Sequence, residues 1–354
     1  MNGLLTYSGI VTKIRAMEGK LLSYEDFCEM ASLETVPQAV EFLQRQPSYH
    51  EILKGMEENA MHRRELEVLL FFAHYRDFEK LYRFANMAQR KFLDLYFMLY
   101  EIEILKKMLR TLADHRVYEV NLSIFYPFFQ RHSKLDWQKT SSAATLEEWI
   151  SSLAGSVYYE PLSQLQANGN ANLFDYEETL DLLYLKTVWK LKDKVIKKKD
   201  QEILIQNYGS QIDMQNIMWI YRFKKFYHLE PEQILPILIP FSYRLKKEEI
   251  SGLIYAEELQ AFFDVLKHTY YASWANRLHM DDLSKLEALS EAILDQVYSL
   301  NSHRHPYSIA SLNGYLYFKE QEIKRIITII EGIRYKLDSQ EILQLIHINK
   351  GVSP

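Results

Sequence analysis

Two groups of side chains in the sequence could hold a metal ion. Asp281-Asp282 with Glu287 is similar to the acidic motifs of all-α metal-dependent enzymes, but the spacing is poor. The aspartate pair fits a helix start better, because the positive end of the helix dipole favours a first-turn carboxylate. His303-Arg304-His305 lies beside Pro306 in a predicted loop and has no partnered carboxylate motif. We therefore expect no metal ion, and a metal-dependent enzyme is the weakest of three functional hypotheses.

The other signatures of catalysis are missing from the sequence. It has no Gly-rich phosphate loop, no G-x-S-x-G and no H-E-x-x-H motif. The single cysteine, Cys28, excludes an intrachain disulfide and any Cys-based zinc or iron–sulfur site within one chain. The net charge of −5, from 42 basic and 47 acidic residues, argues against nucleic-acid binding. We predict no catalytic residue, no cofactor, no small-molecule substrate and no nucleic-acid partner.

Lysines and arginines are the candidates for binding a partner. They form three clusters that could contact an acidic protein or acidic lipid head groups, although a solvated helix face has the same composition. The candidate residues are Lys194, Lys197, Lys198 and Lys199; Arg222, Lys224 and Lys225; and Arg244, Lys246 and Lys247.

The elements that position these residues are helices. Residues 64–110 and 176–208 contain no glycine or proline, and no window alternates with a period of two. Ile323, Ile326, Ile327, Ile330 and Ile333 share one face of a predicted helix, and Asp338-Ser339 is a predicted cap for the next one. The longest apolar run, residues 234–241, is far shorter than the roughly 20 residues that a membrane span needs. The sequence predicts an all-α fold without a transmembrane helix or signal peptide.

Two markers repeat along the chain. A tyrosine element reads Gln46-Pro47-Ser48-Tyr49, Ser156-Val157-Tyr158-Tyr159 and His268-Thr269-Tyr270-Tyr271, with steps of 110 and 112 residues from Tyr49 to Tyr159 to Tyr271. An acidic helix element begins at Glu101, Asp213 and Glu322, with steps of 112 and 109 residues. Similar lead-in segments, 21–23, 134–136 and 244–246, precede the tyrosine elements. We predict three homologous helical repeats, 1–120, 121–236 and 237–354, arranged as a funnel with pseudo-threefold symmetry.

The repeated residues are interpreted as structural. The acids Glu101, Asp213 and Glu322 could bind a partner, but we expect buried contacts with Arg110 or Arg222 across a repeat interface. Each such pair is nine residues apart, so it cannot meet along one helix. The tyrosine elements are expected to form packed helix corners.

Three segments carry a known pattern. The first has Tyr7 and Val11-x-x-Ile14-Arg15-Ala16-Met17-Glu18-x-x-Leu21-Leu22-Ser23. The second has Asp213-x-x-Asn216-Ile217-x-x-Ile220-x-Arg222-x-Lys224, then Glu232-x-Ile234 and Leu238-Ile239-Pro240. The third has Gly314-Tyr315-Leu316-x-x-Lys319-Glu320-x-Glu322-Ile323-x-x-Ile326. In this order they resemble the C subunits of the bacterial and archaeal V-type (A/V-type) ATPases, which are related to the d subunits of the eukaryotic vacuolar enzymes.

This chain departs from the family pattern at a few positions. Phe241 stands where a glycine usually follows the Leu-Ile-Pro sequence, and the asparagine of the helix motif is replaced by Ile104 and Arg325 in the first and third copies.

The resemblance implies a non-catalytic central-stalk component of a rotary ion pump. Such a component is peripheral to the cytoplasmic face of the membrane and acts as a socket between the shaft, formed by the D and F subunits, and the membrane rotor ring of proteolipid subunits. It couples ATP hydrolysis or synthesis to H⁺ or Na⁺ transport. The first alternative is a helical-repeat scaffold of another complex, which would not assemble with ATPase subunits.

Overall fold

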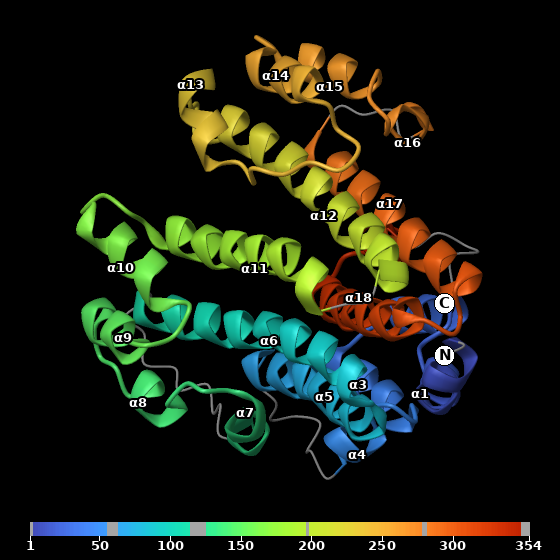
Figure 1. Ribbon diagram of the computed structural model, residues 1–354. Coiled ribbons are helices and arrows are strands. Elements are labelled where there is room, and N and C mark those ends of the chain that lie inside the picture. Colours follow the sequence, from blue (N-terminus) through green and yellow to red (C-terminus); the bar gives the residue numbers. More distant parts are fainter. Residues whose placement is uncertain (1–2, 55–62, 114–124, 196–197, 278–281, 348–354) are drawn as a thin grey trace. The chain divides into compact units, whose positions relative to one another are not determined.

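The computed structural model describes residues 3–54, 63–113, 125–195, 198–277 and 282–347 (Figure 1). Helices make up the regular structure of these ranges, which contain no strand, so the all-α prediction is confirmed. The chain divides into two compact units, one formed by residues 47–196 and the other by residues 1–46 together with 197–354. The three predicted repeats and their funnel arrangement remain predictions, because the two units do not test them.

The unit formed by residues 47–196 is built on two long helices from the segment without glycine or proline. Its elements are α4 (His50–Leu53), α5 (Arg63–Phe84), α6 (Met87–Ala113), α7 (Tyr126–His132), α8 (Trp137–Ser141), α9 (Leu146–Ser152), α10 (Tyr159–Ala167) and α11 (Leu173–Val195). Helix α11 packs along α6. Aromatic rings fill the space between α5, α6 and α7, and Tyr75 lies 4.4 Å from Tyr100 and 5.2 Å from Phe128, centroid to centroid.

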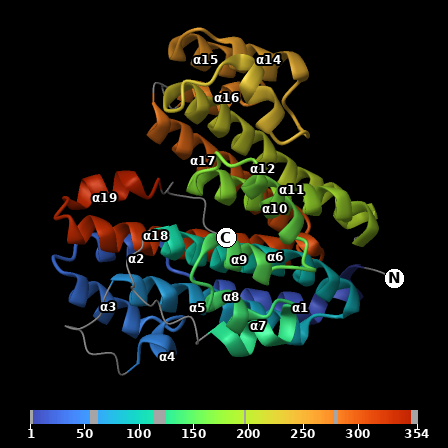
Figure 2. The ribbon, with the colours of Figure 1, turned by 90° about the vertical axis from the view of Figure 1, so that its left-hand side faces the viewer.

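The unit formed by the two chain ends surrounds one central helix. Its elements are α1 (Gly3–Glu18), α2 (Tyr24–Ala31), α3 (Val36–Arg45), α12 (Lys198–Lys225), α13 (Pro231–Ile234), a 3₁₀ turn (Leu235–Ile237), α14 (Lys247–Tyr255), α15 (Leu259–Leu266), α16 (Ala272–Arg277), α17 (Leu283–Arg304), α18 (Ile309–Arg334) and α19 (Ser339–Leu345). Helix α18 contacts α1, α2, α3, α12, α17 and α19 (Figure 2). This is why most of α18 is buried.

Local sequence signals set the ends of these helices. Asp282 caps α17 by accepting a hydrogen bond from the Lys285 N–H at 2.9 Å, which confirms it as a helix start; Asp281 lies outside the described residues. Asp338 caps α19 as predicted, with its carboxylate 2.8 Å from the backbone nitrogens of Gln340 and Glu341. The structure corrects one boundary, because α17 runs to Arg304 and therefore includes His303, which we expected in a loop.

The described helices include none that is long and apolar enough to cross a bilayer. The predicted isoleucine face is confirmed on α18, where Ile323, Ile326, Ile330 and Ile333 are buried and Ile327 is half-buried. Burial of such side chains is the main stabilising contribution to a helical core.

A glycine allows α19 to approach α18 closely. A Cβ atom built on Gly332 would lie 2.6 Å from Cγ1 of Ile342, which is itself buried. We expect Gly332→Ala to lower the free energy of unfolding by ~1–3 kcal/mol, because overpacking forces side chains out of their rotamers. Urea unfolding followed by circular dichroism measures this change.

Gly9, on α1, is the matched control because a Cβ there would meet nothing within 4 Å. Gly9→Ala should raise the free energy of unfolding by ~0.5–1 kcal/mol, since alanine is the better helix former. Stabilisation by both substitutions would show that the contact between Gly332 and Ile342 is not tight.

Candidate functional site

The repeated acid Asp213 lies at a buried hydrogen-bond centre on α12. Its carboxylate accepts hydrogen bonds from the backbone N–H groups of Tyr243, Arg244 and Leu245 at 2.8, 2.7 and 3.2 Å. The hydroxyl of Tyr271 donates a fourth, at 2.8 Å. Burial raises the pKa of Asp213, and these four donors oppose that rise. The acid thereby fixes the segment that leads from α13 to α14.

The two other repeated acids hold equivalent segments. Glu101, on α6, accepts a hydrogen bond from the hydroxyl of Tyr158 at 2.6 Å and another from Ser133, whose Oγ accepts the N–H of Leu135 at 3.1 Å. Glu322, on α18, accepts the N–H of Leu22 at 2.5 Å and the ammonium of Lys319 at 2.5 Å. We call these three sites the carboxylate centres.

Each carboxylate centre thus joins an acidic helix element to one of the lead-in segments. Leu135 and Leu245 follow their acids in the chain, whereas Leu22 precedes Glu322 by 300 residues. The N-terminal segment is therefore held by the C-terminal long helix. Asp213 and Glu322 accept the N–H of a lead-in residue directly, whereas Glu101 reaches its lead-in through the Ser133 hydroxyl.

The expected pairing of the acids with arginines is wrong. Arg110 forms an ion pair with Glu177, 2.5 Å away, and Arg222 forms one with Glu287 at 3.1 Å. Nine residues along a helix place the arginine on a different face from the acid. Asp213 and Glu101 are instead held by N–H and hydroxyl donors, which avoids burying a cation at a high desolvation cost, whereas Glu322 pairs with the buried Lys319.

The tyrosine elements form packed corners, and one register assigned from the sequence is off by a residue. Tyr158, rather than Tyr159, is the counterpart of Tyr271, because both are buried and both donate to a carboxylate centre. Their backbone N–H groups donate to Ser156 Oγ and Thr269 Oγ1, each at 3.2 Å. Tyr49 is also buried.

The first basic cluster is only partly described. Lys194 belongs to α11, and Lys198 and Lys199 to α12, but their side chains lie outside the described part of the structure, as does Lys197 altogether. This cluster therefore stays a prediction.

The remaining basic candidates fall into two groups. Arg222 is paired with Glu287, and the ammonium of Lys224 donates to the Ile254 carbonyl at 2.6 Å. Burial also lowers the pKa of Lys224. Both side chains thus hold α12 to neighbouring elements. The exposed members of the set are Lys225, Arg244, Lys246 and Lys247.

Aromatic and aliphatic side chains accompany these exposed cations. The guanidinium of Arg244 lies 4.6 Å from the ring centre of Tyr243 and 4.8 Å from that of Tyr270, a geometry that favours cation–π attraction. Other exposed apolar residues come from the end of α12, the 3₁₀ turn and the end of α14: Phe226, Tyr227, Leu235, Ile237 and Tyr255. Sequence reasoning missed this apolar component, although Phe226-Tyr227 directly follows a basic cluster.

We call the exposed cations and apolar residues together the tip surface: Lys225, Phe226, Tyr227, Leu235, Ile237, Arg244, Lys246, Lys247, Tyr255 and Tyr270. They come from α12 to α16 and the intervening loops, and α12 to α15 pack together at one end of this unit (Figure 1). Arginine and aromatic residues are enriched in protein interfaces.

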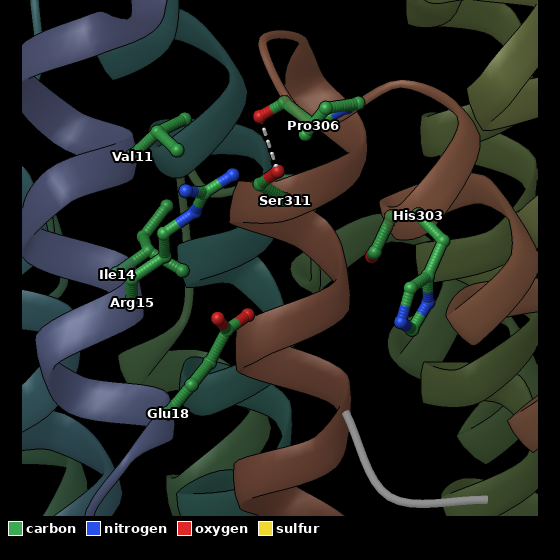
Figure 3. A pocket seen from close by; sticks show the side chains of 8 residues that line it. Val11, Ile14, Arg15, Glu18, His303, Pro306 and Ser311 are labelled. Atoms are coloured by element: carbon green, nitrogen blue, oxygen red, sulfur yellow. Dashed lines mark hydrogen bonds between the residues drawn. The ribbon is translucent and has the colours of Figure 1, made fainter.

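A pocket of about 270 Å³ lies between α1 and the junction of α17 and α18 (Figure 3). Burial raises the pKa of Glu18 in this pocket, although Arg15 and His303 partly oppose the rise. His303 Nδ1 lies 2.8 Å from the Ser299 carbonyl of its own helix. Within the described ranges no group of three or more His, Cys, Asp or Glu side chains could hold a metal ion. The lining residues are Val11, Ile14, Arg15, Glu18, Ser302, His303, Pro306 and Ser311.

Comparisons with known proteins identify the family. The model of the ATP synthase (C/AC39) subunit family matches residues 10–345. The chain belongs to this family. It is similar to the C subunit of the A-type ATP synthase of Methanosarcina mazei, with 24% identity over 93% of this chain and 89% of that one. The corresponding subunits from Thermococcus kodakarensis and Desulfurococcus sp. are 25% and 26% identical, each over 96% of this chain and 90% of the relative.

The family confirms the resemblance and agrees with a structural component of an ATPase complex rather than an enzyme.

Hydrogen bonds in the structure explain the central motif of the resemblance. Three residues after Asp213, the Asn216 side chain accepts the Ile239 N–H at 2.9 Å and donates to the Ile239 carbonyl at 3.1 Å. The two motif residues together fix the Leu-Ile-Pro segment and the lead-in that follows it. Phe241, in place of the usual glycine, is accommodated half-buried.

The hydroxyl of Tyr271 allows a clean test of the Asp213 centre. Tyr271→Phe removes one donor from a buried carboxylate and should lower the free energy of unfolding by ~1.5–3 kcal/mol. Tyr270→Phe is the control, because Tyr270 is 52% exposed and keeps its ring beside Arg244. Urea unfolding of both variants gives the comparison, and equal stabilities would contradict the role of the Tyr271 hydroxyl.

Proposed function

We propose that this chain is the central-stalk adaptor of an A/V-type ATPase. In this role it seats the shaft, formed by the D and F subunits, on the proteolipid ring at the cytoplasmic face of the membrane, and transmits torque between ATP turnover and H⁺ or Na⁺ transport. The family match over residues 10–345 carries the proposal. The relatives from Methanosarcina mazei and Thermococcus kodakarensis align over about 90% of their own length, so the chain corresponds to nearly the whole of such a protein.

The internal contacts of the chain suit torque transmission. A part that transmits torque must deform little, and close-packed helices have low compressibility. The carboxylate centres add directional bonds between elements distant in sequence, such as Leu22 and Glu322. Sliding of α2 along α18 would break a hydrogen bond to a buried charge, which is far more costly than a shift between apolar surfaces.

The tip surface is the proposed contact for a partner subunit. Its four exposed cations supply attraction for an acidic partner surface, and its exposed aromatic rings supply apolar contact area. Arg244 is held between two rings, so little side-chain entropy is lost when it binds. Lys194, Lys197, Lys198 and Lys199 are proposed as a second contact on sequence grounds alone.

Affinity capture from native membranes tests the proposed function. The tagged chain should recover the ATPase head, shaft and proteolipid ring at low salt and in mild detergent. Recovery of a different set of proteins would instead support the scaffold of another complex. Recovery of no ATPase component would overturn the adaptor role.

Charge reversal tests the tip surface. Lys246→Glu with Lys247→Glu should weaken association with the partner subunits roughly tenfold near physiological ionic strength, since two attractive charges become repulsive. The fold should persist, because glutamates at the start of α14 suit the helix dipole. Reconstitution with purified partners, followed by a binding assay at several salt concentrations, measures the effect.

Lys91→Glu with Lys139→Glu is the matched control, because both lysines are exposed and lie outside the tip surface. An equal loss of binding for the two double variants would show that the tip surface is not the specific contact. If the loss of binding caused by Lys246→Glu with Lys247→Glu were as large at high salt as at low salt, the electrostatic explanation would be excluded.

A further inference from the structure

A row of three carboxylates runs along one face of α17. Glu287, Glu291 and Asp295 are spaced four residues apart, so they stand one above the other along the helix. Adjacent members of such a row lie within ~6 Å at the Cβ level, and like charges at this spacing repel each other. The row lies in a helix that packs against α12, α16 and α18.

The two outer members of the row are paired. Arg222 of α12 lies 3.1 Å from Glu287. Arg325 of α18 lies 2.8 Å from Asp295, which also accepts the hydroxyl of Tyr317 at 2.9 Å. The Arg325 and Asp295 side chains are only 12% and 7% exposed. Two guanidinium groups thus neutralise the two ends of the row.

The middle member has no such partner. Glu291 is half-buried, and none of the described residues donates a hydrogen bond to it. Burial, aided by the charges of Asp295 and Glu287, raises the pKa of Glu291 to about 7, although Arg325 and Lys324 oppose the rise. The Nη2 of Arg325 is already engaged by Asp295, and its Nε is buried without an acceptor among the described residues.

Other charged groups around the row do not neutralise Glu291. Lys324 is 55% exposed and pairs with Glu320 at 2.7 Å. Burial lowers the pKa of His347, which follows α19; the charge of Glu287 opposes this shift and the charge of Arg325 adds to it. Arg277, the charged residue of α16, is exposed.

We propose that Glu291 is a proton-dependent switch in the packing of α17 against α12 and α18. With a proton, Glu291 leaves two carboxylates facing two guanidiniums, and the charges along the row balance. Without it, a third negative charge stands between two others in a partly dehydrated row. The helices are then held less tightly. The proposal concerns the isolated chain, so its failure leaves the proposed function untouched.

The sign of the pH dependence follows from the two states. The folded chain holds the Glu291 proton up to a pH of about 7, because its pKa is raised from the ordinary value of 4.5. The stabilisation is fully present below about pH 4.5 and is lost as the pH rises through about 7. Within that window the folding equilibrium constant should fall by up to tenfold per pH unit relative to a chain without this carboxyl group.

The test compares the full chain with two neutral variants, Glu291→Gln and Glu291→Ala. Urea unfolding at pH 5, 6, 7 and 8 should show wild type losing stability relative to either variant as pH rises. Hydrogen exchange of α17 peptides, corrected for the intrinsic pH dependence, should show the same loss locally. The infrared absorption of protonated carboxyl groups should lose intensity near pH 7 in wild type, and this loss should be missing from the variants.

Glu257→Gln, at an exposed position between α14 and α15, is the matched control and should follow wild type at every pH. Parallel stability curves for wild type and both Glu291 variants would overturn the proposal. So would a pH-dependent loss of α17 protection that persists in the variants. If Glu291→Gln does not fold, the infrared and exchange measurements on wild type and Glu291→Ala decide the question.

Discussion

The architecture depends on buried carboxylates that hold distant segments through hydrogen bonds, either from backbone N–H groups or from hydroxyl groups. A lead-in loop has polar backbone groups that cannot enter a packed interior without partners. A carboxylate offers two oxygens with about four acceptor positions, so one side chain can satisfy several donors. Asp213 does this for three consecutive N–H groups and one tyrosine. The loop thereby becomes as fixed as the helices that it joins.

The same constraint explains why the chain ends belong together. The acid of α18, Glu322, accepts the N–H of Leu22 and is neutralised by Lys319, which is fully buried. Removal of the Lys319 or the Glu322 side chain would leave the other charge uncompensated in a dry environment, which costs several kcal/mol. The contact therefore works as an all-or-none link between α2 and α18. Links of this kind resist partial slippage, which suits the torque-transmitting role proposed for the chain.

Sequence patterns predicted the elements well because helical periodicity is a local property. The isoleucine spacing of α18 and the Asp338 cap depend on residues within one or two turns of each other. The repeated acids and lead-ins were also found, since their residue types recur at nearly constant steps. Their contacts with each other became clear only in three dimensions. The choice between Tyr158 and Tyr159 depends on which way the chain leaves the corner, and that direction is set by packing against Glu101.

The candidate surface was harder to predict, because exposure is decided by neighbours that a linear pattern does not name. Arg222 and Lys225 are equally basic in the sequence, but Glu287 covers the first and nothing pairs with the second among the described residues. Phe226 and Leu235 resemble core residues by type, but they are 56% and 60% exposed. Composition could therefore locate a basic region but not its aromatic component.

Arg325 stands where the helix motif has an asparagine, and this difference connects the Glu322 centre to the row of carboxylates that contains Glu291. Asn216 follows Asp213 by three residues and binds the backbone N–H and C=O of one residue, Ile239, whereas Arg325 follows Glu322 by three residues. The arginine cannot accept an N–H and instead turns its guanidinium to Asp295 on α17. A cation at this position allows buried acids on the facing helix, but one guanidinium neutralises only one of them. At this position of the third predicted repeat a charged contact therefore stands in place of a neutral one, with one carboxylate in excess on the facing helix, and Glu291 is that carboxylate.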